Sequence, residues 1–282
     1  MCDVRSRFRV TVDSAAVKVL ALDFDGVVCD SFREVLATAL AAYEEMAPDS
    51  RVLASLRSRL GRGPWHALET HNDPVAAAFE ALMPLGNRAE DFGVALRAIE
   101  DGAAIRDQAS YDLFYAAVGE RWMHEFHDRF YEERGQARAR DLDGWIGLHA
   151  SYPWFLELLR RHAGDARLAL ATAKDRRSAR LLLDHLGVGD LFAPELVMDK
   201  EAGKDKTAHL VAIHARAGVE LAAITFVDDK VNHLLKVAPL GVRPILAGWG
   251  FNGDREHELA RRLGLAVANT GNAERVLYGG GT

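Results

Sequence analysis

The chain has 282 residues, of which 49% are hydrophobic and 27% are charged, a balance that excludes a disordered or fibrous protein. Its formal net charge of −6 argues against general nucleic-acid binding, which usually needs a basic surface. No stretch reaches the ~20 consecutive apolar residues of a membrane helix, and the first residues lack the apolar segment of a signal peptide. With only Cys2 and Cys29, neither a disulfide framework nor a cysteine metal cluster is expected, and we predict a cytoplasmic protein that binds no membrane.

The first predicted element is a short strand at residues 17–22. Its sequence, VKVLAL, is nearly all apolar or β-branched and ends in an acidic turn that contains Gly26. A short apolar run of this kind is typical of a strand buried in a parallel sheet.

The next segment, residues 32–149, is predicted to be a helical domain inserted into the chain. It is rich in Ala, Leu, Arg and Glu and has no clear strand pattern. Helical spacing predicts two apolar faces, one made of Phe32, Val35, Leu36, Ala39, Leu40 and Tyr43 and one made of Tyr111, Phe114, Tyr115, Val118 and Trp122. We therefore expect two domains, with residues 1–31 and 150–282 forming the other.

From about residue 150, strand patterns alternate with helical patterns. Strands are predicted at residues 167–172, 222–227 and 243–247, with weaker candidates at 195–198 and 265–268, and helices at 178–186 and 206–217. This alternation predicts an α/β fold with right-handed crossovers and a Rossmann-like parallel sheet covered by helices on both faces. Ligands of such sheets bind at the carboxyl ends of the strands.

Two carboxylates follow the first predicted strand. Asp23 and Asp25 are alternate residues at its carboxyl end, where they should lie near one another. Neighbouring carboxylates repel unless a cation lies between them, and Mg²⁺ prefers oxygen ligands of this kind. An ordinary acidic turn would explain the pair equally well if it stood alone.

Further polar residues follow the later strands. Thr172 ends the second core strand, Lys204 and Lys206 precede a helix, and Asp228 and Asp229 end the fourth strand. Each is ordinary by itself, as a β-branched strand residue or a surface charge. Their common position at strand ends favours one functional site.

Four segments in this order, DFDGVVCDS, LALATAKD, GKDKTAHL and ITFVDDKVNHL, resemble the four motifs of the haloacid dehalogenase (HAD) superfamily. The likeness covers residues 17–31 and 150–250, and the helical insert occupies the place of that superfamily's cap. The segment GWGFN at residues 248–252 also resembles a loop of phosphoglycolate-phosphatase-like members. The resemblance implies a Mg²⁺-dependent phosphatase whose substrate is a small phosphorylated metabolite, either phosphoglycolate-like or a sugar phosphate.

The resemblance also implies roles for the acidic residues. Asp23 would be the nucleophile that forms an aspartyl phosphate, and Asp25 would be the general acid and base. Mg²⁺ would be held by Asp23, by the backbone carbonyl of Asp25 and by an acid of the fourth motif, where Asp229 aligns better than Asp228. His233 stands where relatives often carry a further acid, and Asn232 could take its place.

For the phosphoryl group, the resemblance implies a hydroxyl donor at Thr172 and a lysine that neutralises charge in the transition state. Lys204 aligns with the family's Gly-Lys element and is favoured, whereas Lys206 opens the helix as in other relatives. Ala173, Lys206 and Arg88 are further candidates for binding the substrate, Arg88 because its context is loop-like.

Two alternatives keep the same fold. A phosphotransferase or mutase would use the same Asp23 nucleophile but pass the phosphoryl group to a second substrate, and a noncatalytic binding protein would retain the fold without the reaction. A dehalogenase is disfavoured, because such relatives lack the acid that Asp25 supplies. The sequence identifies neither the substrate nor the oligomeric state.

Overall fold

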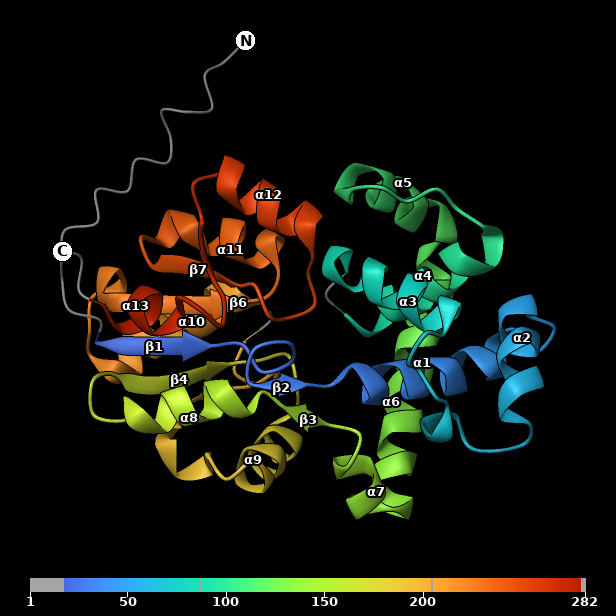
Figure 1. Ribbon diagram of the computed structural model, residues 1–282, viewed down its shortest axis with the longest axis horizontal. Coiled ribbons are helices and arrows are strands. Elements are labelled where there is room, and N and C mark those ends of the chain that lie inside the picture. Colours follow the sequence, from blue (N-terminus) through green and yellow to red (C-terminus); the bar gives the residue numbers. More distant parts are fainter. Residues whose placement is uncertain (1–17, 87, 204, 280–282) are drawn as a thin grey trace, which may run out of the picture. The chain divides into compact units, whose positions relative to one another are not determined.

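The computed structural model describes residues 18–86, 88–203 and 205–279 (Figure 1). The chain divides into two compact units. The core unit comprises Met1–Asp30 and Ser151–Thr282, and the inserted unit comprises Ser31–Ala150. Two short strands, β2 (Cys29–Asp30) and β3 (Ala150–Ser151), form a two-stranded sheet where the chain passes from one unit to the other.

The core unit is built on a six-stranded parallel sheet, which confirms the predicted α/β fold class. Its strands are β1 (Val19–Leu22), β4 (Arg167–Ala171), β5 (Phe192–Met198), β6 (Ile224–Asp228), β7 (Arg243–Ala247) and β8 (Ala266–Ala268). They lie in the order β5-β4-β1-β6-β7-β8 and pair in parallel throughout. Every predicted strand is present, and the weak candidate at 195–198 is the end of a longer strand.

Helices cover both faces of this sheet, because side chains of a strand alternate between its two faces. The helices are α8 (Pro153–Arg161), α9 (Arg176–His185), α10 (Lys206–Ala217), α11 (Val231–Val237), α12 (Asp254–Arg262) and α13 (Ala273–Tyr278). Val19 and Ala21 of β1 pack in one cluster with residues of α10 and α11. Leu20 and Leu22 are equally buried but point to the opposite face, where α8 and α9 lie (Figure 1).

The strand order determines where the functional side chains meet. The chain moves outward from β1 through β4 to β5 and then crosses back to β6 on the other side of β1. The carboxyl ends of β4, β1 and β6 are therefore neighbours at the switch point, the place where open α/β sheets bind ligands. Thr172, Asp23 and Asp229 directly follow these three strands.

Helices and the loops between them make up the inserted unit, and Ala150 is the one strand residue among its described residues. Its α-helices are α1 (Phe32–Met46), α2 (Arg51–Leu60), α3 (Pro74–Leu82), α4 (Ala89–Asp101), α5 (Gln108–Val118), α6 (Glu120–Arg140) and α7 (Leu142–Ile146), and η2 (Trp65–Ala67) and η3 (Met83–Leu85) are short 3₁₀ turns. Helices α1, α4 and α6 pack on one another. All six residues of the first predicted apolar face lie in α1 and are buried.

The second predicted apolar face is not continuous. Gly119, with a φ of 93°, ends α5 and begins α6, so Trp122 belongs to a different helix from Tyr111. Both residues nevertheless contribute to one apolar cluster around Val94. The spacing of the apolar residues was therefore informative about burial, but glycine in the left-handed region interrupts the helix.

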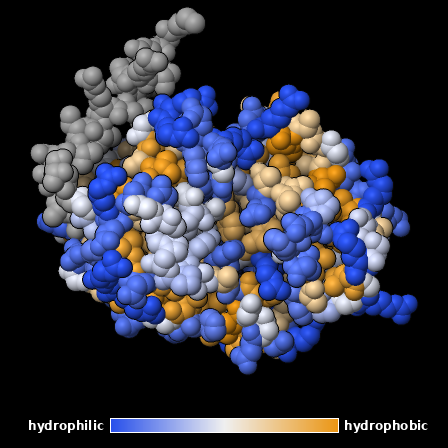
Figure 2. Space-filling view, viewed as in Figure 1, coloured by the Kyte–Doolittle hydropathy of each residue, from blue (hydrophilic) through white to orange (hydrophobic). Residues whose placement is uncertain are grey.

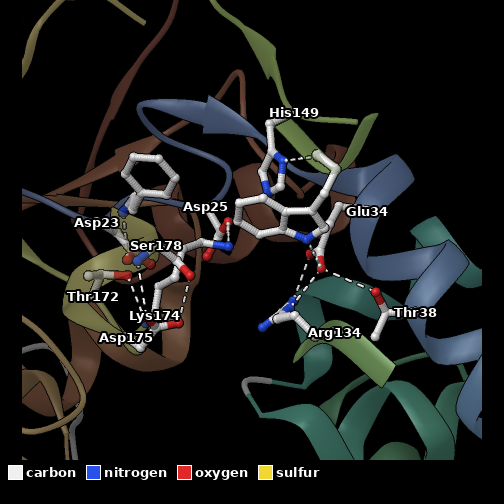
Figure 3. A network of polar contacts seen from close by, with 12 residues as sticks. Asp23, Asp25, Glu34, Thr38, Arg134, His149, Thr172, Lys174, Asp175 and Ser178 are labelled. Atoms are coloured by element: carbon white, nitrogen blue, oxygen red, sulfur yellow. Dashed lines mark hydrogen bonds and ion pairs between the residues drawn. The ribbon is translucent and has the colours of Figure 1, made fainter. Parts of the chain in front are cut away.

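A buried ion pair connects three helices of the inserted unit. The Glu34 carboxylate of α1 is fully buried and accepts two hydrogen bonds of 2.7 Å from the Arg134 guanidinium of α6. It also accepts hydrogen bonds from the Thr38 hydroxyl and from the Trp145 indole of α7 (Figure 3). These partners satisfy a carboxylate that would otherwise be costly to bury.

The exposed residues are mostly polar. Figure 2 shows hydrophilic side chains over much of the visible face of each unit, with apolar residues scattered among them. Leu113, Leu142 and Val211 are the large apolar side chains that are exposed among the described residues. No helix in the described part of the chain is both long enough and apolar enough to cross a bilayer.

Candidate active site

Asp23 lies at the carboxyl end of the central strand and is held by the backbone around it. Its amide donates to the Val227 carbonyl of β6 at 2.9 Å, and its carboxylate accepts from the Phe24 amide at 2.7 Å. Residues 24–29 then form a tight turn, in which the amides of Val28 and Cys29 donate to the Phe24 carbonyl. The Asp23 side chain is only 10% exposed, so its carboxylate lies in a nearly water-free position.

Asp25 lies in the same turn but is more accessible. Its side chain is 35% exposed, and one of its carboxylate oxygens lies 3.3 Å from the ammonium of Lys174. Lys174 itself is buried, three residues beyond the end of β4 (Figure 3). The two carboxylates of the turn therefore have different surroundings, one enclosed and one open.

Thr172 directly follows β4 and is buried. Its amide donates to the Met198 carbonyl at 2.9 Å, and its hydroxyl oxygen accepts from the Lys174 amide at 3.1 Å. A hydroxyl that accepts a hydrogen bond from the backbone can still donate its own hydrogen. Thr172 is thus suited to donate a hydrogen bond to a bound anion.

Lys206 is the cation nearest to Asp23. Its ammonium lies 2.6 Å from an Asp23 oxygen and 3.5 Å from an Asp228 oxygen, and it donates to the Ala171 carbonyl at 2.6 Å. Lys206 is the first residue of α10, because the Asp205 side chain caps that helix by accepting from the Ala208 amide. This N-cap fixes the position from which the lysine reaches the site.

The two acids of the fourth motif have separate partners. Asp228 is fully buried and contacts His233 Nδ1 at 2.9 Å, besides accepting from the Lys230 amide. Asp229 is also fully buried, and one of its oxygens accepts from the Phe251 amide at 3.0 Å. Its other oxygen, Oδ1, has no hydrogen-bond partner among the described residues.

The loop at residues 248–252 holds both Asp229 and the turn after Asp23. The Asn252 amide group donates to the Asp229 carbonyl, and the Trp249 indole donates to the Val27 carbonyl, each at 3.0 Å. A Cβ atom on Gly250 would overlap the Gly26 carbonyl oxygen and come within 2.5 Å of the Asp229 Cβ. The backbones therefore approach too closely at this point for a side chain at position 250.

Electrostatics distinguish the acids of the site. Burial raises the pKa of Asp23 from 3.8 to about 6, although Lys206 opposes the shift. Burial also raises the pKa of Asp229 well above its ordinary value, with Lys230 opposing and with Asp228 and Asp23 adding to the rise. Burial acts in the same direction on Asp228, but His233 and Lys206 outweigh it and lower its pKa.

The described residues fit a divalent cation. Three carboxylates, those of Asp23, Asp228 and Asp229, are buried and influence one another, and burial raises the pKa values of Asp23 and Asp229. A ligand atom from each of Asp23, Asp228 and His233 can be chosen so that all lie within 4.8 Å of one another. Because Mg²⁺ prefers oxygen donors, the unpartnered Asp229 Oδ1 is a better candidate ligand than the imidazole.

The structure brings most of the sequence-predicted residues together. The carboxyl ends of β4, β1 and β6 carry Asp23, Asp25, Thr172, Asp228 and Asp229. Lys206 reaches Asp23 from the first position of α10. Ala173 is exposed beside Thr172. Lys204, the lysine favoured from the sequence, lies outside the described residues, whereas Lys206 makes the contact with Asp23.

Arg88 belongs to the inserted unit, and its side chain is 69% exposed. It precedes α4, and its amide donates to the Asp91 carboxylate at 2.9 Å. Its guanidinium lies 3.7 Å from the Glu90 carboxylate. A role in substrate binding stays a prediction.

Sequence reasoning missed one participant and underrated two others. The motif LALATAKD contains Lys174, but nothing in its spacing indicated that the side chain is buried against Asp25. In the sequence, His233 is only a departure from the family pattern, whereas in the structure its Nδ1 lies 2.9 Å from an Asp228 oxygen. The loop at residues 248–252 was read as a family likeness, whereas its hydrogen bonds to Asp229 support the site.

Gly26 offers a test of this close packing. Its φ is 80°, and a Cβ atom there would overlap the Asp229 carboxylate. We expect Gly26→Ala to lower the free energy of unfolding by more than the roughly 1–2 kcal/mol that left-handed backbone costs an alanine, and to reduce any catalytic activity of the site. The matched control is Gly241→Ala, because Gly241 has a φ of 85° and no atom within 4 Å of its Cβ position.

Urea denaturation and steady-state kinetics of both variants check this expectation. If the two substitutions have equal effects on stability and on activity, contact between Gly26 and Asp229 is unimportant and only backbone strain matters.

Comparisons with known proteins agree with this architecture. The model of haloacid dehalogenase-like hydrolases matches residues 17–236. A search of the curated proteins finds no match. Among solved structures, a proposed phosphoglycolate phosphatase from Lactobacillus delbrueckii subsp. bulgaricus is similar with a TM-score of 0.65 and 14% identity, over 94% of this chain and 100% of that one.

Two further structures show the same fold at low identity. A predicted phosphoglycolate phosphatase from Haemophilus somnus 129PT has a TM-score of 0.56 at 14% identity and covers 92% of this chain and 97% of its own. A predicted phosphatase from Clostridium acetobutylicum has a TM-score of 0.56 at 12% identity and covers 93% of this chain and 98% of its own. The family match spans most of the chain, and the fold and motif order agree with it. The chain therefore belongs to the haloacid dehalogenase-like hydrolases.

Proposed function

We propose that the protein is a Mg²⁺-dependent phosphomonoester hydrolase that works through an aspartyl phosphate on Asp23. The observation that carries the proposal is the pairing of the buried Asp23 carboxylate with Lys206 at 2.6 Å, with the more exposed Asp25 two residues away. An enclosed nucleophile beside a fixed cation and an accessible second acid is the arrangement that a two-step phosphoryl transfer needs.

In the first step, a carboxylate oxygen of Asp23 attacks phosphorus, and the bond between phosphorus and the ester oxygen breaks. The carboxyl group of Asp25 gives its proton to that departing oxygen, so the alcohol leaves in neutral form and Asp25 becomes a carboxylate. The greater exposure of Asp25 supports this role, because the acid must reach the substrate.

In the second step, the Asp25 carboxylate accepts a proton from water while the water oxygen attacks phosphorus. The bond between phosphorus and Asp23 breaks, inorganic phosphate forms, and both carboxyl groups return to their starting states. Asp25 thus acts first as acid and then as base, and one residue serves both steps.

Other residues of the site stabilise the phosphoryl group during both steps. Lys206 is buried and directed at Asp23, so its ammonium faces the oxygens to which negative charge spreads. The Thr172 hydroxyl can donate a hydrogen bond to one of these oxygens, since its acceptor side is engaged by the Lys174 amide. Fixed donors of this type contribute strongly because they need no reorganisation.

Mg²⁺ would be held by the carboxylates of Asp23 and Asp229 and by the Asp25 carbonyl. Asp228 is a further candidate ligand. When bound, the ion supplies positive charge that offsets the phosphate dianion. The loop at residues 248–252 would keep Asp229 directed toward the ion through the Phe251 amide.

For the substrate, we propose a small phosphorylated metabolite, with phosphoglycolate-like and sugar phosphates as the leading candidates. The support is the likeness to structures described as phosphoglycolate phosphatases and the presence of a separate helical unit in the position of a cap. A cap that closes over the core would exclude bulk water and add specificity.

The direct test is phosphate release from a panel of two-carbon, three-carbon, sugar and aryl phosphates, with Mg²⁺ and with EDTA. We expect hydrolysis of at least one small ester with Mg²⁺ and loss of that activity with EDTA, recovered when excess Mg²⁺ is added. Adding alcohols or sugars as acceptors separates hydrolysis from phosphotransfer, because a phosphotransferase would release its phosphoryl group to the acceptor rather than to water. Absence of metal-dependent turnover on the whole panel would refute the proposal.

A further inference from the structure

Lys174 is a buried cation of the core unit, and the reaction described above assigns it no role. Its side chain is only 2% exposed, and its ammonium lies 3.3 Å from the Asp25 carboxylate and 5.8 Å from the centre of the Phe24 ring. Among the described residues, this ammonium makes no hydrogen bond with standard geometry. A buried ammonium is unfavourable unless a charge partner compensates it, and the partner here is Asp25.

The surrounding backbone fixes Lys174 from both sides. Its amide donates to the Thr172 hydroxyl at 3.1 Å, and its carbonyl accepts from the Lys200 amide at 3.3 Å. The next residue, Asp175, caps α9 by accepting from the Ser178 amide at 3.0 Å (Figure 3). The lysine therefore extends from a rigid junction between β4 and α9, and its ammonium has a defined position beside the acid.

Each of the two lysines of the site contacts a different carboxylate of the turn after β1. Lys206 contacts Asp23, the proposed nucleophile, whereas Lys174 contacts Asp25, the proposed proton donor. Lys174 lies at the buried side of Asp25, whose side chain is 35% exposed. The ammonium therefore anchors the buried oxygen of a carboxylate that is otherwise partly exposed.

We propose that Lys174 is a positioning residue for Asp25, which directs its carboxyl group at the leaving oxygen and stabilises the carboxylate that remains once the proton has left. The inference rests on the proposed function of the site. Lys174 does not touch the phosphoryl group in this scheme and acts only through Asp25.

The consequence is a specific dependence on the leaving group. A nitrophenolate leaves readily without a proton, whereas an unsubstituted phenolate or an alkoxide needs one. We therefore expect Lys174→Met to lower kcat/KM by about 10- to 100-fold on phenyl phosphate, within the range that general acid catalysis supplies, and by less than about threefold on p-nitrophenyl phosphate. The ratio kcat/KM is the right measure because it covers the steps up to departure of the phenolate and leaves out the later hydrolysis of the aspartyl phosphate, in which Asp25 acts as base on every ester alike.

The experiment compares a series of substituted phenyl phosphates on wild type, Lys174→Met, Asp25→Asn and the double variant. Lys236→Met is the matched control, because Lys236 is an exposed lysine of the same unit in α11. If Lys174 acts through Asp25, the two substitutions are strongly non-additive, and Lys174→Met has almost no further effect in the Asp25→Asn background. The ratio between two esters within one variant is independent of how much of the sample is folded.

Two results would overturn the inference. An equal loss of kcat/KM on all phenyl phosphates, or an undiminished effect of Lys174→Met in the Asp25→Asn background, would mean that Lys174 acts on the substrate or on the fold and not through Asp25. Failure of the wild-type protein to hydrolyse any ester would instead overturn the proposed function, and this inference with it.

Discussion

An Asp23→Asn substitution is expected to lower kcat/KM by at least about 10³-fold on every ester that the wild-type protein hydrolyses, because removal of a nucleophile abolishes the covalent route. The amide keeps the shape of the carboxylate, so the backbone contacts of Asp23 to Val227 and Phe24 should persist. The measurement is steady-state kinetics with Mg²⁺, and the control is Asp190→Asn, an exposed acid of the same unit.

The same variant should change how stability depends on pH. Without divalent cations, the Asp23 pKa of about 6 in the folded protein exceeds its ordinary 3.8, so between these values the folded protein holds a proton that the unfolded chain has lost. The free energy of unfolding therefore falls as pH rises from about 4 to about 6. Denaturation of Asp23→Asn across this range should show a weaker fall than wild type. Full activity of the variant, with equal pH slopes, would contradict the role given to Asp23.

Lys206→Met is expected to impair both activity and folding. The substitution removes the cation from between Asp23 and Asp228 and leaves two carboxylates buried side by side. Loss of one partner from a buried ion pair costs roughly 3–5 kcal/mol, and loss of a preorganised charge donor lowers kcat by about 10²–10³-fold. Urea denaturation in EDTA and kinetics with Mg²⁺ measure the two effects separately.

Two further variants test which lysine is catalytic and whether the buried carboxylates cause the loss of stability. Lys204→Met should leave activity within about threefold of wild type, because Lys206 supplies the ammonium that contacts Asp23. The double variant Asp23→Asn/Lys206→Met should recover part of the lost stability, because one of the two uncompensated charges is gone. If instead Lys204→Met removes activity and Lys206→Met retains it, the catalytic lysine is Lys204.

Much of the core unit could be predicted from the sequence because its strands are buried on both faces. Continuous apolar runs identified β1, β4, β6 and β7, and the helix at residues 206–217 was predicted with its observed ends. Asp205 and Gly218 cap that helix, and caps are local signals that a sequence displays directly. The boundary at Gly119 was missed because the apolar spacing continues across it.

The site was harder to predict wherever contacts join distant parts of the chain. The choice between Lys204 and Lys206 depends on where α10 begins, a matter of two residues that motif alignment does not resolve. The ion pair between Asp25 and Lys174 spans almost 150 positions, and the hydrogen bond from Trp249 to Val27 spans 222. Such pairings follow from strand order and not from local spacing, which is why Lys174 and the loop at residues 248–252 were not assigned roles.

The most direct test of the account is chemical trapping of the covalent intermediate. The protein is mixed with Mg²⁺ and a hydrolysed ester, quenched in acid during turnover, and reduced with borohydride, which converts an aspartyl phosphate to homoserine. Mass spectrometry of the peptide that contains residues 18–30 should then find homoserine at the position of Asp23, only when substrate is present and not in Asp23→Asn. Steady turnover of the ester without any modification at this position, or with modification at another carboxylate, would contradict the account.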